Sequence, residues 1–314
     1  QMLADDHRGL NYELTVALAP VGTQLLLLSG SVANPERIVS WLRSNGREAV
    51  LVRHHQRPVP LEEVKIEALP DRLPLPVKGK WPRWIARALA VDMGPVLVFA
   101  PQRKTAEELA KKLSAALPLA DWLELTPHQR SIAGDDLAKL LRNRIAYHHS
   151  GLSYPQRAGL IEPLAKAGQL RVVVATTGLA AGINFCMRSV VVTDREYRVG
   201  EHTRQVRPDE LLQMYGRAGR RGLDDRGYVL VADGKPRLQE AAPLQLRRTN
   251  QVDWPVFISV MQQAVQEGED PVESVRSLVD RLFSDQRIPI GLADFIAAYR
   301  DQPRIFQGGP TGRQ

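Results

Sequence analysis

Three side chains in residues 213–222 have the types and the spacing to act on phosphate groups. The segment reads Gln-Met-Tyr-Gly-Arg-Ala-Gly-Arg-Arg-Gly, so Gln213 and Arg217 are four residues apart, and Arg217 and Arg220 are three apart. Pro208 predicts a helix start, and on a helix that runs on, the three side chains would share one face. Two planar, permanently charged guanidinium groups suit the neutralisation of charge that develops during phosphoryl transfer. A solvated arginine-rich helix is the alternative interpretation.

A second phosphate-type pattern lies upstream. Arg-Val-Val-Val-Ala at 171–175 is a β-branched run that predicts a buried strand of a parallel sheet. It is followed by Thr-Thr-Gly-Leu-Ala-Ala-Gly-Ile-Asn-Phe at 176–185. These residues offer hydroxyl groups and bare amides at the carboxyl end of a strand, where ligands bind in open α/β sheets. An apolar run at 189–193 continues a β-α-β rhythm. An ordinary strand-to-helix turn is the alternative.

Together these two segments resemble motifs V and VI of superfamily 2 helicases. The resemblance is to the DExH branch that holds exosome-associated RNA helicases and archaeal DNA-repair helicases. Three more matches occur in the family's order: Leu-Ser-Gly-Ser-Val-Ala-Asn-Pro at 28–35 resembles motif III, Val-Leu-Val-Phe-Ala-Pro at 96–101 resembles motif IV, and Tyr-His-His-Ser-Gly-Leu-Ser at 147–153 resembles the motif between IV and V. Five motifs in order are far more specific than any one of them.

The resemblance implies roles for individual residues. Arg217 and Arg220 would reach the γ-phosphate of ATP, and Gln213 would help to position them. Gly182 and Asn184 would lie near the nucleotide. In motif III, Ser29 and Ser31 would couple the nucleotide to the strand, although Ser-Gly-Ser lacks the family's threonine, for which Ser31 could substitute. Nucleic acid would be held by Thr176, Gly151, Arg103, His149, Tyr197, Arg198 and Arg204.

Residues 194–207 alternate about Gly200, which predicts a β-hairpin. In the related helicases a hairpin at this place separates duplex strands. The resemblance therefore implies that Tyr197 and His202 stack on a base, while Arg198 and Arg204 hold phosphates. A solvated charged ribbon is the alternative.

Two family motifs are missing from the sequence. It contains no Gly-x-x-x-x-Gly-Lys-Ser/Thr phosphate loop and no Asp-Glu-x-His box. The opening Gln-Met-Leu-Ala-Asp-Asp-His-Arg-Gly resembles the segment at motif II of this branch, which would make Gln1 the fourth residue of that box. We therefore expect the C-terminal part of a longer helicase, with ATP and Mg²⁺ bound mainly by the preceding half and no ATPase activity in this part alone.

Composition agrees with a nucleic-acid partner. A net charge of +7 over 314 residues favours a polyanion, and single-stranded or partly duplex RNA or DNA is the leading candidate. The single cysteine, Cys186, excludes an internal disulfide and fits a reducing compartment. We expect a cytoplasmic protein, a monomer in preference to an oligomer, no metal site of its own, and no membrane span, because the longest apolar run is too short.

The predicted fold class is α/β, with a RecA-like parallel sheet as the main domain. Strands are expected at 24–28 and 49–53, and a helix starting at Asp270. The predicted parts are 1–57, the remnant of a first RecA-like domain; 58–77, a proline-punctuated linker; 78–235, the second RecA-like domain; 243–300, a helical segment that would begin a winged-helix domain; and 301–314, a disordered tail.

The function that the resemblance implies is ATP-driven 3′-to-5′ translocation on nucleic acid with duplex unwinding. A binding module without catalysis, derived from half of a helicase, is the alternative from another class. A Rossmann-type oxidoreductase is a weaker rival, because the sequence lacks Gly-x-Gly-x-x-Gly after a first strand.

Overall fold

The chain divides into two compact units. The computed structural model describes residues 3, 9–54, 56–73, 76–118, 121–177, 182–199, 202–247 and 253–283. Residues 53–244 form the larger unit, and residues 1–52 with 245–314 form the smaller one.

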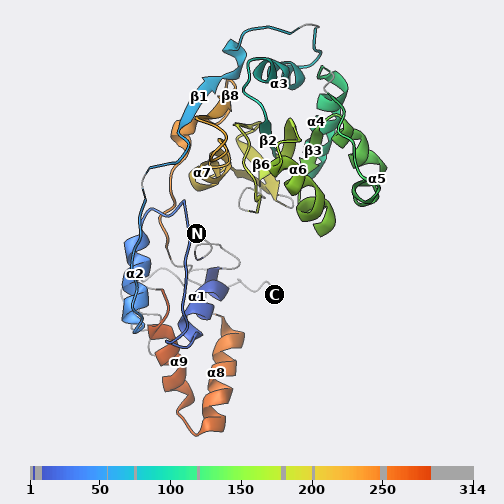
Figure 1. Cartoon of the computed structure of the whole chain (residues 1–314). Coiled ribbons are helices and arrows are strands. Elements are labelled where there is room, and N and C mark those ends of the chain that lie inside the picture. The colour runs from blue at the N-terminus through green and yellow to red at the C-terminus, as the bar shows by residue number, and fades with distance from the viewer. Residues whose placement is uncertain are drawn as a thin grey trace, which may run out of the picture. The chain divides into compact units, whose positions relative to one another are not determined.

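The larger unit is built on a six-stranded sheet in which every strand is parallel to its neighbours (Figure 1). In sheet order the strands are β1 (Leu61–Lys65), β8 (Gly227–Val231), β5 (Ser189–Val192), β2 (Val96–Ala100), β4 (Val172–Thr176) and β3 (Ile145–His148). The central strands β2 and β4 are buried along their whole length. Burial on both faces explains why they read in the sequence as continuous apolar runs.

Helices cover both faces of this sheet. Side chains of α3 (Lys80–Ala90) and α4 (Arg103–Ala116) pack on the face that presents Val96 and Val98. Leu97 and Phe99 face the opposite core, to which three helices contribute: α5 (Pro127–Arg142), α6 (Glu162–Lys166) and α7 (Pro208–Tyr215). A π-helical turn, Pro155–Ile161, leads into α6. The predicted α/β class with a RecA-like parallel sheet is confirmed.

The edge strand β1 lies inside the stretch predicted to be a linker. It pairs with β8 in parallel register, Leu61 opposite Gly227 and Lys65 opposite Val231. The proline-punctuated linker predicted over 58–77 thus contains a strand of the sheet. An edge strand is paired on one side only and half-buried, so Leu-Glu-Glu-Val-Lys carries a weak strand pattern that the nearby prolines hide.

The smaller unit is helical. It contains α1 (Gly9–Leu18), α2 (Pro35–Ser44), α8 (Trp254–Glu267) and α9 (Pro271–Asp280), and the last two lie in the segment predicted to be helical. Asp270 caps α9 as expected, accepting from the amides of Val272 and Glu273. Its core is formed by Leu10, Leu14, Ala17, Phe257, Val275, Leu278, Val279 and Leu282. Residues predicted as two separate parts, 1–57 and 243–300, thus share one core over their described residues.

The strands predicted at 24–28 and 49–53 do not form. Both segments are outside the helices and strands of the described chain, and apolar side chains in them face solvent: Leu26 and Leu28 are each 83% exposed and Val52 is 88% exposed. A strand needs a neighbour to satisfy its backbone groups, and among the described residues neither segment has one.

Two expectations fall on residues outside the described part: the tail 301–314 and the last residues, 284–300, of the helical segment. Among the described residues no helix has both the length and the apolar character that crossing a bilayer requires.

Candidate nucleotide and nucleic-acid sites

The helix that begins at Pro208 stops before it reaches the two arginines. α7 ends at Tyr215, with Gly216 as its C-terminal cap, and only Gln213 lies within it. Arg217 and Arg220 lie in the turns after this cap, so the prediction of one shared helical face is wrong. A helix does not run on to Arg220, because Gly219 has a φ of +82°, a conformation that breaks a helix and that glycine adopts readily.

The loop after α7, residues 216–222, is tied to Met187, two residues after motif V. The amide of Met187 donates to the carbonyl of Arg217 at 3.0 Å, and the amide of Gly219 donates to the carbonyl of Met187 at 2.8 Å. Met187 and Ala218 therefore form an isolated parallel bridge. Motif VI is thus joined by backbone hydrogen bonds to the segment that directly follows motif V.

Arg57 also holds this loop. Its guanidinium group donates to the carbonyl of Gly216 at 3.0 Å and to that of Ala218 at 2.5 Å, and its Nε donates to the carbonyl of Val59 at 2.7 Å. Carbonyl groups that the helix end leaves without an intrahelical partner are in this way satisfied by a side chain. Burial lowers the pKa of Arg57 from its usual value.

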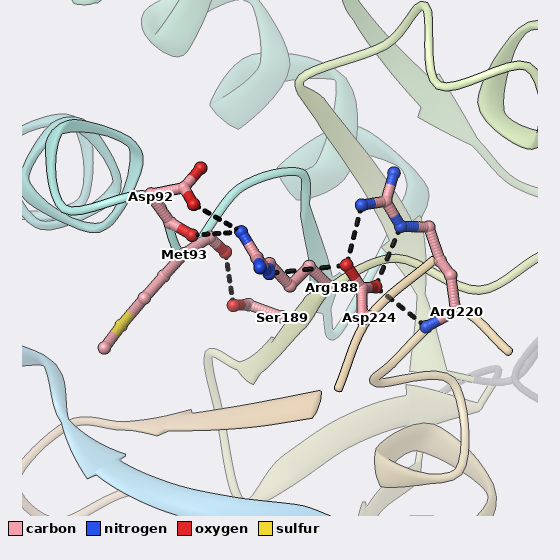
Figure 2. Close-up of polar contacts among 6 residues, drawn as sticks. All are labelled: Asp92, Met93, Arg188, Ser189, Arg220 and Asp224. Atoms are coloured by element: carbon pink, nitrogen blue, oxygen red, sulfur yellow. Dashed lines mark hydrogen bonds and ion pairs between the residues drawn. The ribbon is translucent and has the colours of Figure 1, made fainter. Parts of the chain in front are cut away.

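Arg220 is held by a buried carboxylate, that of Asp224 (Figure 2). Nε of Arg220 donates to Oδ2 at 2.9 Å, Nη2 donates to Oδ1 at 2.8 Å, and the Arg220 amide also donates to Oδ2 at 2.9 Å. The side chain of Asp224 is 1% exposed and that of Arg220 is 22% exposed. This bidentate arrangement fixes the guanidinium plane.

A second arginine contacts the same carboxylate. Nε of Arg188 lies 3.3 Å from Oδ1 of Asp224, and its Nη1 donates to Asp92 at both the backbone carbonyl, 2.6 Å, and the carboxylate, 2.7 Å. Burial of Asp224 by itself raises the pKa of its carboxyl, but hydrogen bonds from Arg220 and the two guanidinium charges lower that pKa overall. The hydrogen bond to Asp224 raises the pKa of Arg220. The Asp224 carboxylate and the Arg220 guanidinium are therefore both charged at neutral pH.

A separate cluster gathers the residues expected to hold nucleic-acid phosphates. Nη2 of Arg103 donates to the Ser150 hydroxyl at 2.7 Å, and a Cβ placed on Gly151 would lie 3.4 Å from Nη1 of Arg103. Nδ1 of His149 accepts a hydrogen bond from the Gly151 amide at 3.1 Å, and Nε2 of His149 lies 2.9 Å from Oε1 of Glu107. The structure therefore brings Arg103, His149 and Gly151 together.

The contacts of His149 fix its tautomer. Nδ1 accepts a hydrogen bond, so the proton of the neutral ring is on Nε2, facing Glu107. The ring is 4% exposed and stacks on Tyr147 with centroids 5.3 Å apart. Burial lowers the pKa of His149 despite the nearby Glu107 carboxylate. His149 therefore orients the loop as a neutral group and does not contribute a cation to a phosphate.

The remaining predicted residues lie in several places. Thr176 ends β4 and is buried, and the buried hydroxyl of the next residue, Thr177, has no hydrogen-bond partner among the described residues. Gly182 and Asn184 are exposed in the segment between β4 and β5, of which residues 178–181 lie outside the described part. Ser29 and Ser31 belong to the smaller unit, where the Ser31 amide donates to the Ser29 hydroxyl at 3.4 Å.

The predicted hairpin is confirmed, but Tyr197 has a different role in it. β6 (Glu196–Val199) and β7 (His202–Gln205) pair antiparallel. Tyr197 is only 8% exposed, and its hydroxyl donates to Oε1 of Glu210 in α7 at 2.8 Å. Burial and this carboxylate raise the pKa of Tyr197 to about 12. The prediction that Tyr197 stacks on a base is corrected: its ring anchors the hairpin to α7.

The two clusters lie at opposite edges of the sheet. Arg103, Ser150 and Thr176 lie at or just beyond the carboxyl ends of β2, β3 and β4. The network of Asp92, Arg188, Arg220 and Asp224 precedes the amino ends of β2, β5 and β8. Because all strands are parallel, these two groups of loops are separated by the length of the strands.

Sequence reasoning missed Arg57, Arg188 and Asp224. For Asp224 a signal was present, since an arginine and an aspartate four residues apart are a common ion pair. Arg57 and Arg188 reach their partners only through the tertiary fold, and no spacing in the sequence marks them. Among the described residues no three histidine, cysteine, aspartate or glutamate side chains come together as a metal site.

Comparison with known proteins adds a family to this geometry. Residues 83–222 match the model of the helicase conserved C-terminal domain. The ATP-dependent DNA helicase Hel308 of Thermoplasma acidophilum is 33% identical over 76% of this chain and 35% of its own length, and that of Pyrobaculum calidifontis is 37% identical over 74% and 35%. The ATP-dependent RNA helicase mtr4 of Schizosaccharomyces pombe is 26% identical over 73% of this chain and 26% of its length.

The chain spans about a third of the length of the curated Hel308 relatives it matches. Residues 83–222 contain four of the five segments that resemble superfamily 2 motifs, and the parallel sheet of the larger unit is the fold expected for such a domain. The chain thus carries a helicase C-terminal domain and is a homologue of the superfamily 2 helicases Hel308 and mtr4.

Proposed function

We propose that this chain is the C-terminal part of an ATP-dependent nucleic-acid helicase that translocates 3′ to 5′ and unwinds duplexes. The observation that carries the proposal is the loop 216–222. It holds Arg217 and Arg220 outside a helix: backbone hydrogen bonds tie the loop to Met187, just after motif V, and a buried carboxylate holds Arg220. A binder without catalysis needs no such arrangement of two permanent cations.

Arg217 and Arg220 fit the phosphate end of a nucleotide. Planar guanidinium groups on a fixed backbone stabilise charge that develops on a transferring phosphoryl group. When bound, ATP with Mg²⁺ supplies the free energy of hydrolysis, and a preceding half with a phosphate loop would hold most of both. Gln213 lies in the last turn of α7, where its side-chain amide donates to the carbonyl of Asp209 at 3.2 Å, and we propose that it helps to position the arginines that follow. We assign Gly182 and Asn184, in the segment between β4 and β5, to nucleotide binding as well.

The carboxyl edge of the sheet would follow the tracking strand. Arg103 offers a guanidinium group and Thr176 a hydroxyl group, each a common donor to phosphate oxygens. The amide of Gly151 donates to His149, so Gly151 would act by letting the strand approach a backbone without a side chain. Arg198 and Arg204 in the hairpin would add phosphate contacts near the duplex. Ser29 and Ser31 would couple the nucleotide to the strand from the smaller unit.

The anchoring of the hairpin supports its role at the duplex. Tyr197 donates a hydrogen bond to Glu210. The Glu210 carboxylate also accepts a hydrogen bond from the amide of Arg207 at 2.8 Å and so caps α7. A hairpin fixed to the helix that leads into the arginine loop can resist force from a duplex. We further propose that residues 24–28 and 49–52, whose leucine and valine side chains are exposed, form strands that pair with strands of the preceding half.

The substrate of the proposed helicase is RNA or DNA, and the relatives include a helicase for each. The single cysteine and the net charge of +7 support a nucleic-acid-binding protein of a reducing compartment, which we place in the cytoplasm as a monomer. The alternative, a binding module without hydrolysis, predicts the same nucleic-acid affinity but no effect of the arginines on turnover.

The chain should bind single strands weakly, with a strong salt dependence and little preference for sequence. Aromatic residues make up 6% of the sequence, so contacts to the backbone should outweigh base stacking. The slope of log affinity against log salt should be about −0.7 per phosphate neutralised. Fluorescence anisotropy with homopolymers of each base, as RNA and as DNA, measures both quantities. Strong discrimination between homopolymers contradicts the proposed backbone grip.

The variant Arg103→Gln tests whether the surface around Arg103 binds the nucleic acid. It should reduce the magnitude of the salt slope by about 0.7, the loss of one phosphate contact. The matched control is Arg226→Gln, because Arg226 is 64% exposed and precedes β8 at the opposite edge of the sheet. Both variants lose one positive charge, so an equal effect of the two would show attraction by net charge alone.

A further inference from the structure

We propose that Asp224 is a positioning residue for Arg220, and that it turns one guanidinium nitrogen, Nη1, toward the phosphate of the nucleotide. The inference rests on the proposed function of Arg220. It concerns three groups outside the five family motifs, namely Asp224, Arg188 and Asp92, whose contacts appear in Figure 2.

The first step is the geometry of the guanidinium group. The Asp224 carboxylate accepts hydrogen bonds from Nε and Nη2 of Arg220, at 2.9 and 2.8 Å, and from the backbone amide of the same residue at 2.9 Å. A carboxylate bound to both the start and the end of one side chain leaves it a single orientation. Nη1, which carries two N–H groups, points away from the carboxylate (Figure 2).

The second step is the space around Nη1. A Cβ placed on Gly168, in the turn before β4, would lie 3.8 Å from Nη1, an ordinary van der Waals distance. Nη1 therefore lies beside the turn that carries Gly168, and even a side chain there would not crowd it. The side chain of Arg220 remains 22% exposed although its carboxylate partner is only 1% exposed.

The third step is charge. If Asp224 paired with Arg220 alone, its negative charge would cancel the positive charge of Arg220 that is proposed to attract a phosphate. Arg188 changes this balance, because it brings a second guanidinium group to 3.3 Å from Asp224. The three buried or half-buried groups then carry a net positive charge. Asp92 anchors Arg188 from outside, but its carboxylate is 90% exposed, where water screens its charge.

The fourth step is entropy. A free arginine side chain has about 2 kcal/mol of rotamer entropy to lose on binding. Asp224 removes that freedom before a nucleotide arrives, so the donor is already placed when charge develops. Since a misplacement of about 1 Å can lower a rate about 100-fold, the carboxylate affects turnover without touching the nucleotide.

The test uses Asp224→Asn, a replacement of the same shape that puts an amide group opposite one of the two guanidinium donors. Its matched control is Asp225→Asn, because Asp225 is the next residue and is exposed. In the longer helicase polypeptide that the proposed function requires, Asp224→Asn should lower kcat about 10- to 100-fold and leave KM for ATP within about twofold. Asp225→Asn should change neither.

Two readouts separate positioning from simple loss of structure. Affinity for ADP with tetrafluoroaluminate, a mimic of the transferring phosphoryl group, should fall with kcat, while affinity for ADP stays unchanged. In the 314-residue chain itself, the Nε–H signal of Arg220 should exchange slowly with water and should lose that protection in Asp224→Asn. A variant that simply unfolds would lose ADP affinity together with the dispersed NMR signals of the whole chain. In that case Asp224→Glu, which keeps the carboxylate, is used for the same measurements.

The outcomes distinguish this inference from the proposed function. If Arg220→Ala abolishes turnover but Asp224→Asn and Asp224→Glu keep the wild-type kcat, Arg220 acts without a positioning residue and the inference is overturned. If Arg220→Ala itself keeps the wild-type kcat, the proposed function of Arg220 fails, whatever the result at Asp224.

Discussion

Arg220→Ala is expected to lower ATP turnover roughly 10³- to 10⁵-fold in a helicase polypeptide that contains this chain behind a phosphate-loop half. The physical reason is that the guanidinium group acts on charge present only in the transition state. ATP affinity should stay within about tenfold, because the phosphate loop supplies most of the ground-state binding. Steady-state kinetics with saturating single-stranded nucleic acid measures both values.

The burial of Asp224 complicates this test, and a second variant resolves the complication. Arg220→Ala removes the main partner of a buried carboxylate and can cost about 3–5 kcal/mol of stability. Arg220→Lys keeps a cation beside Asp224 but lacks the planar fork, and it should recover stability while recovering little turnover. Arg221→Ala is the control, because Arg221 is exposed and lies next to Arg220. Equal, small losses in Arg220→Ala and Arg221→Ala would falsify the catalytic interpretation of this loop.

Gly227→Ala should destabilise the larger unit by about 3 kcal/mol or more. A Cβ at Gly227 would lie 2.7 Å from the carbonyl carbon of Ala218 and 2.7 Å from the amide nitrogen of Gly219. Both are backbone atoms of the arginine loop, which its bridge to Met187 holds in place, so neither can move aside cheaply. Thermal unfolding should show a fall in Tm of roughly 6–12 °C for a unit of this size.

Gly159→Ala is the matched control for that measurement. Gly159 lies in the π-helical turn, and a Cβ there would meet no atom within 4 Å, so its Tm should stay close to that of the wild type. A Gly227→Ala protein as stable as Gly159→Ala would mean that β8 does not approach the arginine loop as closely as described.

Much of the fold was predictable because local patterns and tertiary structure agree. Buried strands β2 and β4 are apolar on both faces, and α7 and α9 begin at prolines with acidic first turns or caps, so each carries its own signal. The edge strand β1 carries almost none, because only one side of it is paired and its side chains are half-buried.

The errors have physical causes of the same kind. Residues 24–28 are apolar enough for a strand, but a strand depends on a neighbour that a local pattern does not reveal. Helical spacing from Gln213 to Arg220 assumes a continuous helix, and Gly219 with its positive φ ends that possibility. Tyr197 has the chemistry of a stacking residue, but it is buried against Glu210, which lies on another element.

The candidate site was predictable in part for similar reasons. Arg103, His149 and Gly151 come after the carboxyl ends of parallel strands, which must lie at one edge of the sheet, so their meeting results from topology. The contact of Arg188 with Asp224 depends on two loops before different strands and is visible only in three dimensions.

ATP hydrolysis by the 314-residue chain, alone and joined to a phosphate-loop half, tests the central claim most directly. Alone, the chain should show no turnover above background with or without nucleic acid, because the sequence contains no phosphate loop. Joined to a half that carries the loop and the Asp-Glu box, it should hydrolyse ATP, and single-stranded nucleic acid should stimulate the rate. Robust hydrolysis by the pure chain would contradict the account. So would a joined protein whose turnover is changed neither by nucleic acid nor by the substitutions Arg217→Ala and Arg220→Ala.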